Sequence, residues 1–229
     1  MGTREQGGEP GGVSGWSALH GGVEPAAVVR RWVTGVQRLA GAGPLSRVPP
    51  DVISAAGVVA AAGAVAAAAG GGRWPLGALA LVVLAGVLDG LDGAVALATG
   101  RARPLGAVVD GVADRLGDLL LVAVLAVLGA PAQWCLAVAG LVLLHEYLRV
   151  AARAAGMPGI GAVTVAERPT RIVVVAVACL GSGTLPAGTP LTGWDWATVS
   201  AVLWVALGVT GLVHLAVAVV RTIPPAFPE

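Results

Sequence analysis

The chain has 229 residues, 56% of them hydrophobic, and a mean hydropathy of +0.85. Apolar stretches of about twenty residues recur along it, which excludes an ordinary soluble domain. The formal net charge is only +1, and its basic residues, all of them arginine, are scattered among connecting segments, so we expect no nucleic-acid partner.

The N-terminal region is expected to lie outside the membrane. Residues 1–24 are rich in glycine and lack the compact apolar core of a signal peptide, which predicts a disordered cytoplasmic tail. Residues 25–47 alternate apolar side chains such as Trp32 and Val33 with Arg30 and Arg31. This alternation predicts an amphipathic helix on the membrane surface, with a plain juxtamembrane linker as the alternative.

Hydropathy along residues 48–222 predicts an all-α, polytopic membrane domain with six transmembrane helices, followed by a C-terminal tail at 223–229. The two cysteines, Cys135 and Cys179, fall in separate apolar segments without neighbouring His or Cys, so we expect small buried side chains rather than a disulfide or a metal site. The six spans are expected at residues 52–71, 75–99, 106–128, 132–152, 171–187 and 195–220.

The distribution of arginine predicts the orientation. All but two arginines fall on one side of the expected spans, and cytoplasmic loops are the ones enriched in positive residues. Only Arg73 falls on the other side, and Arg115 lies within a span. We therefore expect a multi-pass protein of the inner (plasma) membrane with both termini in the cytoplasm. Four tryptophans at the expected outer boundary agree with this orientation: Trp74, Trp134, Trp194 and Trp196.

Four aspartates stand where the second and third spans approach the cytoplasmic face. Asp89 and Asp92 fall in the last turns of the second span, and Asp110 and Asp114 fall early in the third. At 100° per residue, the first two lie about 60° apart around their helix and the second two about 40° apart. The short turn at residues 101–104 joins the two helices, so we expect the two pairs to face each other.

Four carboxylates around one gap repel one another, and charge at this depth is costly, so the cluster indicates a bound cation. Hard oxygen ligands suit Mg²⁺ or Mn²⁺, which keep positions open for substrate phosphates. Gly93, Ala96 and Gly106 leave room beside the acids for a nucleotide or diphosphate. Helix packing is the alternative role for the glycines, and a structural network is the alternative for the acids. Arg115 and Asp118, three residues apart, are expected to form an intrahelical pair.

The spacing of these residues resembles a known signature, Asp-x2-Asp-Gly-x2-Ala-Arg-x8-Gly-x3-Asp-x3-Asp of the CDP-alcohol phosphatidyltransferases. The segment Pro50-Asp-Val-Ile-Ser54 also looks like the Pro-Asn-x-x-Thr segment before the family's first span, and six spans with a cytoplasmic N-terminal helix are the family's usual architecture. One position departs, because Leu97 stands where the signature has Arg, and Arg101 or Arg103 is expected to substitute. The matching residues are Asp89, Asp92, Gly93, Ala96, Gly106, Asp110 and Asp114.

The resemblance implies a function in phospholipid biosynthesis. The four aspartates would hold one or two Mg²⁺ or Mn²⁺ ions on the diphosphate of a CDP-diacylglycerol donor, and Asp114 would also be the general base. An acceptor hydroxyl would attack the lipid-side phosphorus and expel CMP. Gly93, Ala96, Gly106 and the adjoining Arg101 and Arg103 would surround the nucleotide. Members of the family are commonly dimers, which implies a homodimer here.

The acceptor is expected to meet a second group of arginines. The stretches at 147–153 and 167–171 are similar to those of actinobacterial phosphatidylinositol phosphate synthases, in which basic residues hold the acceptor's phosphate. The family's Lys-x-Arg pair is Arg149-Val150-Ala151 here, so one cation is missing or moved to Arg153. Inositol phosphate, glycerol phosphate and an unphosphorylated alcohol therefore stay open, and anchoring at the interface is the alternative role for these side chains. The expected acceptor residues are Arg149, Arg153, Arg168 and Arg171.

Three rival functions are compatible with buried acids. A divergent and weakly active member of the family would explain Leu97. An intramembrane prenyltransferase also holds Mg²⁺ and a diphosphate, but generally with two separated Asp-rich motifs and more spans. A small ion-coupled transporter also uses buried acids, but the four aspartates lie at the cytoplasmic end instead of the midplane, and no inverted repeat is apparent.

Overall fold

The computed structural model describes residues 47–157 and 164–223, and within those ranges the regular structure consists of helices. Each of the six expected spans coincides with one of these helices to within a few residues. The expected tail at 1–24, the amphipathic helix up to residue 46 and the last six residues lie outside the described residues. The helices are α3 (Pro50–Ala68), α4 (Trp74–Ala98), α5 (Pro104–Val127), α6 (Ala132–Ala154), α7 (Arg168–Thr184) and α8 (Trp196–Thr222).

Local sequence explains where these helices begin and end. Four helices carry a proline in their first turn, where its fixed φ suits the helix and its missing N–H costs nothing. At the start of α8 the Asp195 carboxylate accepts a hydrogen bond of 2.6 Å from the backbone N–H of Thr198. Gly100, with a φ of 65°, follows α4 and allows the chain to turn within a few residues into α5.

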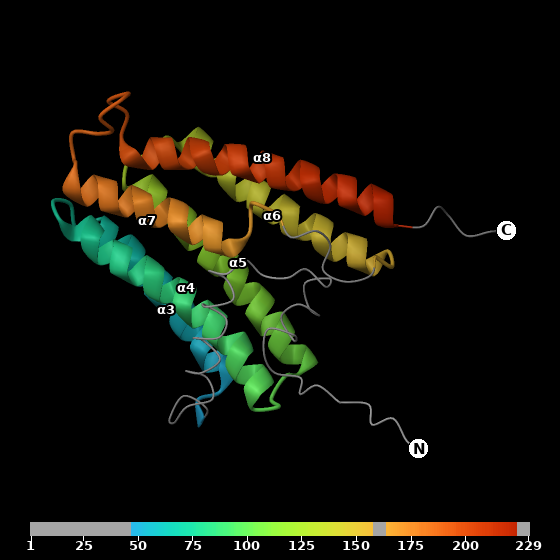
Figure 1. The fold of residues 1–229 in the computed structure, drawn as a ribbon. Coiled ribbons are helices and arrows are strands. Elements are labelled where there is room, and N and C mark those ends of the chain that lie inside the picture. The colour runs from blue at the N-terminus through green and yellow to red at the C-terminus, as the bar shows by residue number, and fades with distance from the viewer. Residues whose placement is uncertain (1–46, 158–163, 224–229) are drawn as a thin grey trace, which may run out of the picture.

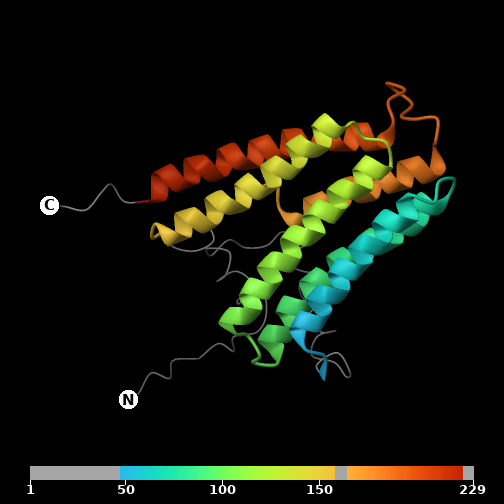
Figure 2. The ribbon, with the colours of Figure 1, turned by 180° about the vertical axis from the view of Figure 1, so that it is seen from behind.

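The helices form two groups, one of α3, α4 and α5 and the other of α6, α7 and α8, which meet at one end (Figures 1 and 2). α3 packs most extensively on α4 and also contacts α5, while α6 packs on α8, and α7 contacts both α4 and α8. α5 and α6 leave the turn between them in diverging directions, which both views show. The N-terminal end of α5, where Asp110 and Asp114 lie, therefore stands apart from the C-terminal ends of α6 and α8.

Small apolar side chains fill the interior where the two groups meet. Leu121, Val124 and Leu125 of α5 are almost fully buried there, and Cys135 and Cys179 are buried free thiols in the same cluster. The expectation that both cysteines are small buried side chains is confirmed. Many valines and leucines on the outer faces are exposed instead, as expected for helices that contact lipid.

Four helices, α3, α4, α6 and α8, are long and apolar enough to cross a membrane. The apolar sequence of α5 is interrupted by four charged residues, namely Asp110, Asp114, Arg115 and Asp118. α7 is shorter, with only 17 residues. Over the residues that the structure describes, the molecule is thus an all-helical membrane protein.

Candidate functional site

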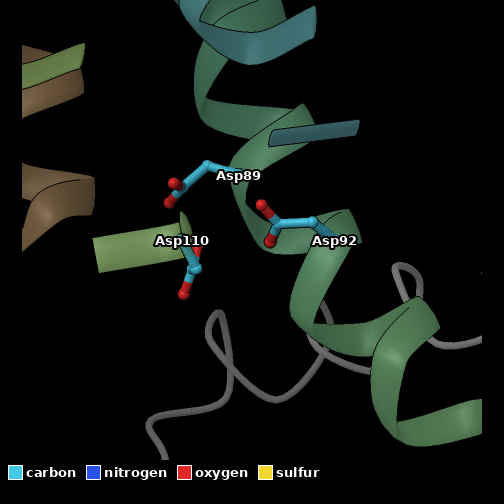
Figure 3. Close-up of side chains that lie close together, drawn as sticks. All are labelled: Asp89, Asp92 and Asp110. Carbon is cyan, nitrogen blue, oxygen red and sulfur yellow. The ribbon is translucent and has the colours of Figure 1, made fainter. Parts of the chain in front are cut away.

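Three of the four expected carboxylates come together at the end of α4. Asp89 and Asp92 lie on α4 and Asp110 lies on α5, and one carboxylate oxygen from each lies within 4.8 Å of the others. Figure 3 shows the three side chains gathered beside the last turns of α4. Separation by three residues places Asp89 and Asp92 on neighbouring positions of one helical face, as the sequence predicts. Their relation to Asp110 depends on how α5 packs.

Asp92 is buried and is held by α3. The Ser54 hydroxyl donates a hydrogen bond of 2.6 Å to Asp92 Oδ2, and the backbone N–H of Gly93 lies 2.6 Å from Asp92 Oδ1. Ser54 is itself buried, so this hydrogen bond is shielded from water. The sequence singled out Ser54 through its resemblance to the family's entry segment, but the contact with Asp92 depends on the packing of α3 against α4.

Asp114, the fourth expected carboxylate, binds an arginine that also contacts Asp89. Arg168, the first residue of α7, donates from its guanidinium to Asp114, and the same Nη1 lies 2.9 Å from Asp89 Oδ1. One guanidinium thus joins α4, α5 and α7 at the cluster. The Nε of Arg168 finds no hydrogen-bond acceptor among the described residues.

Beyond Arg168, a buried charge network links α5, α6 and α7. Arg171 is 3% exposed, and it donates 2.6 Å to Asp118 Oδ2 and 2.9 Å to the Ala166 carbonyl. Arg115 lies 3.3 Å from Asp118 and 3.2 Å from Glu146, so the expected pair with Asp118 is present, although Arg171 is the nearer partner of Asp118. This burial favours a structural role for Arg171 over the acceptor role expected from the sequence.

Sequence reasoning did not assign roles to the acids that organise the remaining arginines. Arg149 donates a hydrogen bond of 2.8 Å to Glu167 Oε1, which also accepts one of 3.1 Å from the backbone N–H of Thr164. Burial alone raises the pKa of Glu167, but the hydrogen bonds from Arg149 and Thr164 outweigh it and hold the pKa below its ordinary value. Arg153 lies one turn beyond Arg149 on α6 and is exposed.

The residues expected around a nucleotide lie at the edge of the carboxylate cluster. Arg103 pairs with Asp51 at the start of α3, and a Cβ on Gly106 would lie 3.2 Å from Arg103 Cγ. Gly93 faces open space, since a Cβ added there would meet no neighbouring atom within 4 Å. Leu97 is 51% exposed on the same helix. The nucleotide-binding role of all five residues stays a prediction: Gly93, Ala96, Gly106, Arg101 and Arg103.

One cavity lies at the carboxylate cluster and another beside the turns that join α3 to α4 and α7 to α8. A small one of about 10 Å³ is lined by Ser54, Asp89, Asp92 and Arg168 among others, and it has room for little more than one water molecule. The larger one, of about 630 Å³, lies near Arg73 and Trp196 at the other end of the helices. The lining of the larger cavity includes Asp195 but none of the four signature aspartates, so we place the chemistry at the small cavity.

The donor set at the cluster fits a divalent metal ion. Asp89, Asp92 and Asp110 offer three carboxylate oxygens from two helices, which are the hard ligands that Mg²⁺ and Mn²⁺ prefer. Three protein ligands leave further coordination positions for a substrate. Asp114 stands outside this group of three and is held by Arg168.

Comparison with known proteins identifies relatives over most of the chain. The sequence model of the CDP-alcohol phosphatidyltransferase family matches residues 47–220. Phosphatidylinositol phosphate synthase of Mycolicibacterium smegmatis is 36% identical over 191 residues, which cover 77% of this chain and 79% of that protein. Archaetidylinositol phosphate synthase of Aeropyrum pernix is 35% identical over 103 residues, covering 44% of this chain and 53% of that protein. The chain thus matches about half the length of this archaeal relative.

Solved structures show the same fold. Mycobacterium tuberculosis phosphatidylinositol phosphate synthase with CDP-DAG bound matches with a TM-score of 0.60 and 25% identity, over 84% of this chain and 98% of that one. The structure of the same enzyme with manganese and citrate matches with a TM-score of 0.57 and 25% identity, over 86% of this chain and 90% of that one.

Proposed function

The chain belongs to the CDP-alcohol phosphatidyltransferase family, and from this premise we propose that it transfers a phosphatidyl group from a CDP-linked lipid to a hydroxyl acceptor and releases CMP. The observation that carries the proposal is the grouping of Asp89, Asp92 and Asp110 in the register of the family signature. Asp89 and Asp92 lie on α4, which is long and apolar enough to cross a membrane, so the cluster would lie within reach of a lipid donor.

The donor's diphosphate would lie against the carboxylate cluster. A dication held by Asp89, Asp92 and Asp110 would supply the positive charge that stabilises the attacked and leaving oxygens. Mn²⁺ accompanies one of the solved relatives, which supports Mg²⁺ or Mn²⁺ as the cofactor. Ser54 fixes the orientation of Asp92 through its hydrogen bond, so the ligand oxygens are held in place before substrate binds.

The cytidine and its phosphate would lie beside the open faces of Gly93 and Gly106. Arg103 is already at this edge and is held by Asp51, from which it can turn toward an anion. Arg101 precedes it in the same turn. These arginines would supply the positive charge that Leu97 lacks in this chain.

Asp114 would act as the general base. Its carboxylate would accept the proton of the acceptor hydroxyl while that oxygen bonds to the lipid-side phosphorus and the bond to the CMP oxygen breaks. Arg168 contacts Asp114 directly, so a guanidinium stands where the acceptor would approach the base. The acceptor is therefore proposed to meet Arg168 first, with Arg149 and Arg153 on α6 as further cations.

The relatives support an acceptor that carries a phosphate. The mycobacterial relatives are phosphatidylinositol phosphate synthases and the archaeal ones are archaetidylinositol phosphate synthases. Inositol phosphate is the acceptor that this similarity favours, and glycerol phosphate is the second candidate. We also propose that all six helices span the inner membrane, that both termini are cytoplasmic and that the protein is a homodimer.

Purified protein is expected to release CMP from CDP-diacylglycerol only when Mg²⁺ or Mn²⁺ and a suitable hydroxyl acceptor are both present. A panel containing inositol phosphate, glycerol phosphate and their unphosphorylated alcohols measures which acceptor is used. A chelator added before the donor is expected to stop the release. Proteoliposome ion uptake without CMP release under any acceptor would instead support the transporter, and would contradict this proposal.

Leu97→Arg is expected to leave acceptor-dependent CMP release unchanged or to raise it. Leu97 is half exposed, so the longer side chain has room, and its charge would stand near the donor's phosphates. The Michaelis constant for CDP-diacylglycerol and the turnover number measure the effect. A sharp fall in turnover would show that this pocket has been rebuilt around the apolar side chain.

A further inference from the structure

Arg168 occupies the centre of the acidic site in the structure. Its guanidinium contacts Asp114 on α5 and lies 2.9 Å from Asp89 on α4, while the side chain is only 19% exposed. Asp89 is also one of the three residues that could hold a metal ion. The arginine and the metal ion would therefore share a ligand.

Gly117 makes this position of Arg168 available. A Cβ added at Gly117 would lie 2.6 Å from Arg168 Nη2, closer than real Cβ contacts allow. Gly117 lies three residues after Asp114, so its bare backbone is on the same face of α5 as the carboxylate. A larger residue would require the guanidinium or its surroundings to shift.

α7 is held on α5, so the start of the helix cannot easily move to take Arg168 away from Gly117. Arg171, one turn later on α7, is buried against Asp118, one turn later on α5. Arg171 Nε also donates to the Ala166 carbonyl just before α7. Two arginines of α7 thus face two aspartates of α5, and only the first of these pairs touches the metal ligands.

The positive charge of Arg168 affects both the carboxylates and a bound metal ion. The neighbouring carboxylates repel one another, and a guanidinium between Asp89 and Asp114 lowers that repulsion. A dication bound to Asp89 would in turn repel the guanidinium only a few ångströms away. The two positive groups therefore compete for Asp89.

We propose that Gly117 is a positioning residue that seats Arg168 between Asp89 and Asp114, where its guanidinium competes with a divalent cation for Asp89 and is displaced when the cation binds. This inference rests on the metal site in the proposed function. Once displaced, the guanidinium is available to an incoming phosphate, and Asp114 is released to act as the base. Metal loading and access of the acceptor to Asp114 are then coupled through one side chain.

Calorimetry of Mn²⁺ binding to the full-length protein in detergent, without substrates, tests this coupling. Arg168→Gln removes the competing charge and is expected to tighten Mn²⁺ binding by about tenfold. Gly117→Ala is also expected to tighten Mn²⁺ binding, because the added Cβ meets the tip of the flexible Arg168 side chain, which can move away from Asp89. Gly111→Ala on the same helix is the matched control, since its Cβ meets no atom within 4 Å, and it is expected to leave the affinity unchanged.

The double variant Gly117→Ala with Arg168→Gln separates positioning from a general structural effect. If Gly117 acts through Arg168, the double variant binds Mn²⁺ as tightly as Arg168→Gln alone. An equal change from Gly117→Ala in both backgrounds, or from Gly111→Ala, would overturn the inference. Unchanged affinity in Arg168→Gln would overturn it too, while leaving the metal site intact. Absence of Mn²⁺ binding in every protein, Arg168→Gln included, would overturn both the inference and the metal site of the proposed function.

Discussion

Asp114→Asn is expected to lower acceptor-dependent CMP release by about 10²–10⁴-fold, the usual contribution of a positioned general base. The amide keeps the size of the side chain but cannot take the proton of the acceptor hydroxyl. Because Asp114 lies outside the group formed by Asp89, Asp92 and Asp110, Mn²⁺ binding is expected to persist in this variant. The turnover number and the calorimetric Mn²⁺ affinity measure the two effects separately.

Asp195→Asn is the matched control for this substitution. Asp195 caps the first turn of α8, far along the chain from the cluster, and Asn is an equally good capping residue. The control is expected to keep wild-type turnover. Full activity in Asp114→Asn would remove Asp114 as the base, and loss of Mn²⁺ binding in that variant would make it a metal ligand instead.

Arg171→Met is expected to lower the free energy of unfolding by about 3 kcal/mol, because it leaves the Asp118 carboxylate buried without its nearest cation. The Asp118 side chain is 1% exposed, and the remaining partner, Arg115, lies at 3.3 Å. The shift of the thermal unfolding midpoint in detergent measures this loss.

Arg73→Ala is the control for the stability measurement. Arg73 is exposed between α3 and α4, so its removal is expected to change stability by no more than about 0.5 kcal/mol. A double variant that also replaces Asp118 with Leu is expected to regain part of the loss, since the uncompensated charge is then gone. An unchanged midpoint in Arg171→Met would show that the buried pair does not hold α7 on α5.

Helix positions followed from the sequence because apolar runs, first-turn prolines and turn glycines act locally. Residues 75–99 were expected as a span, and α4 runs from Trp74 to Ala98. The sequence predicted less well which helices cross the membrane, because α5 combines an apolar half with several charged residues. Charged side chains raise the cost of insertion unless other helices shield them, and that shielding is a tertiary property.

In the candidate site, too, some contacts could be predicted from the sequence and others could not. The sequence predicted that Asp89 and Asp92 share a helical face and that, across the short turn, they meet Asp110 and Asp114. It did not predict that Asp114 is held by Arg168, or that Arg171 is buried against Asp118. Both contacts join residues more than fifty positions apart, and no local periodicity relates them.

The sequence by itself determined an all-helical membrane protein with a signature of aspartates at one end of two consecutive helices, because hydropathy and helical spacing are properties of neighbouring residues. Apart from the intrahelical pair of Arg115 and Asp118, only the tertiary structure decided which arginine meets which carboxylate. That choice depends on how α7 packs against α4 and α5, and on the bare backbone of Gly117 that lets a guanidinium approach. Charge pairing between distant segments is set by helix packing, which local sequence patterns do not determine.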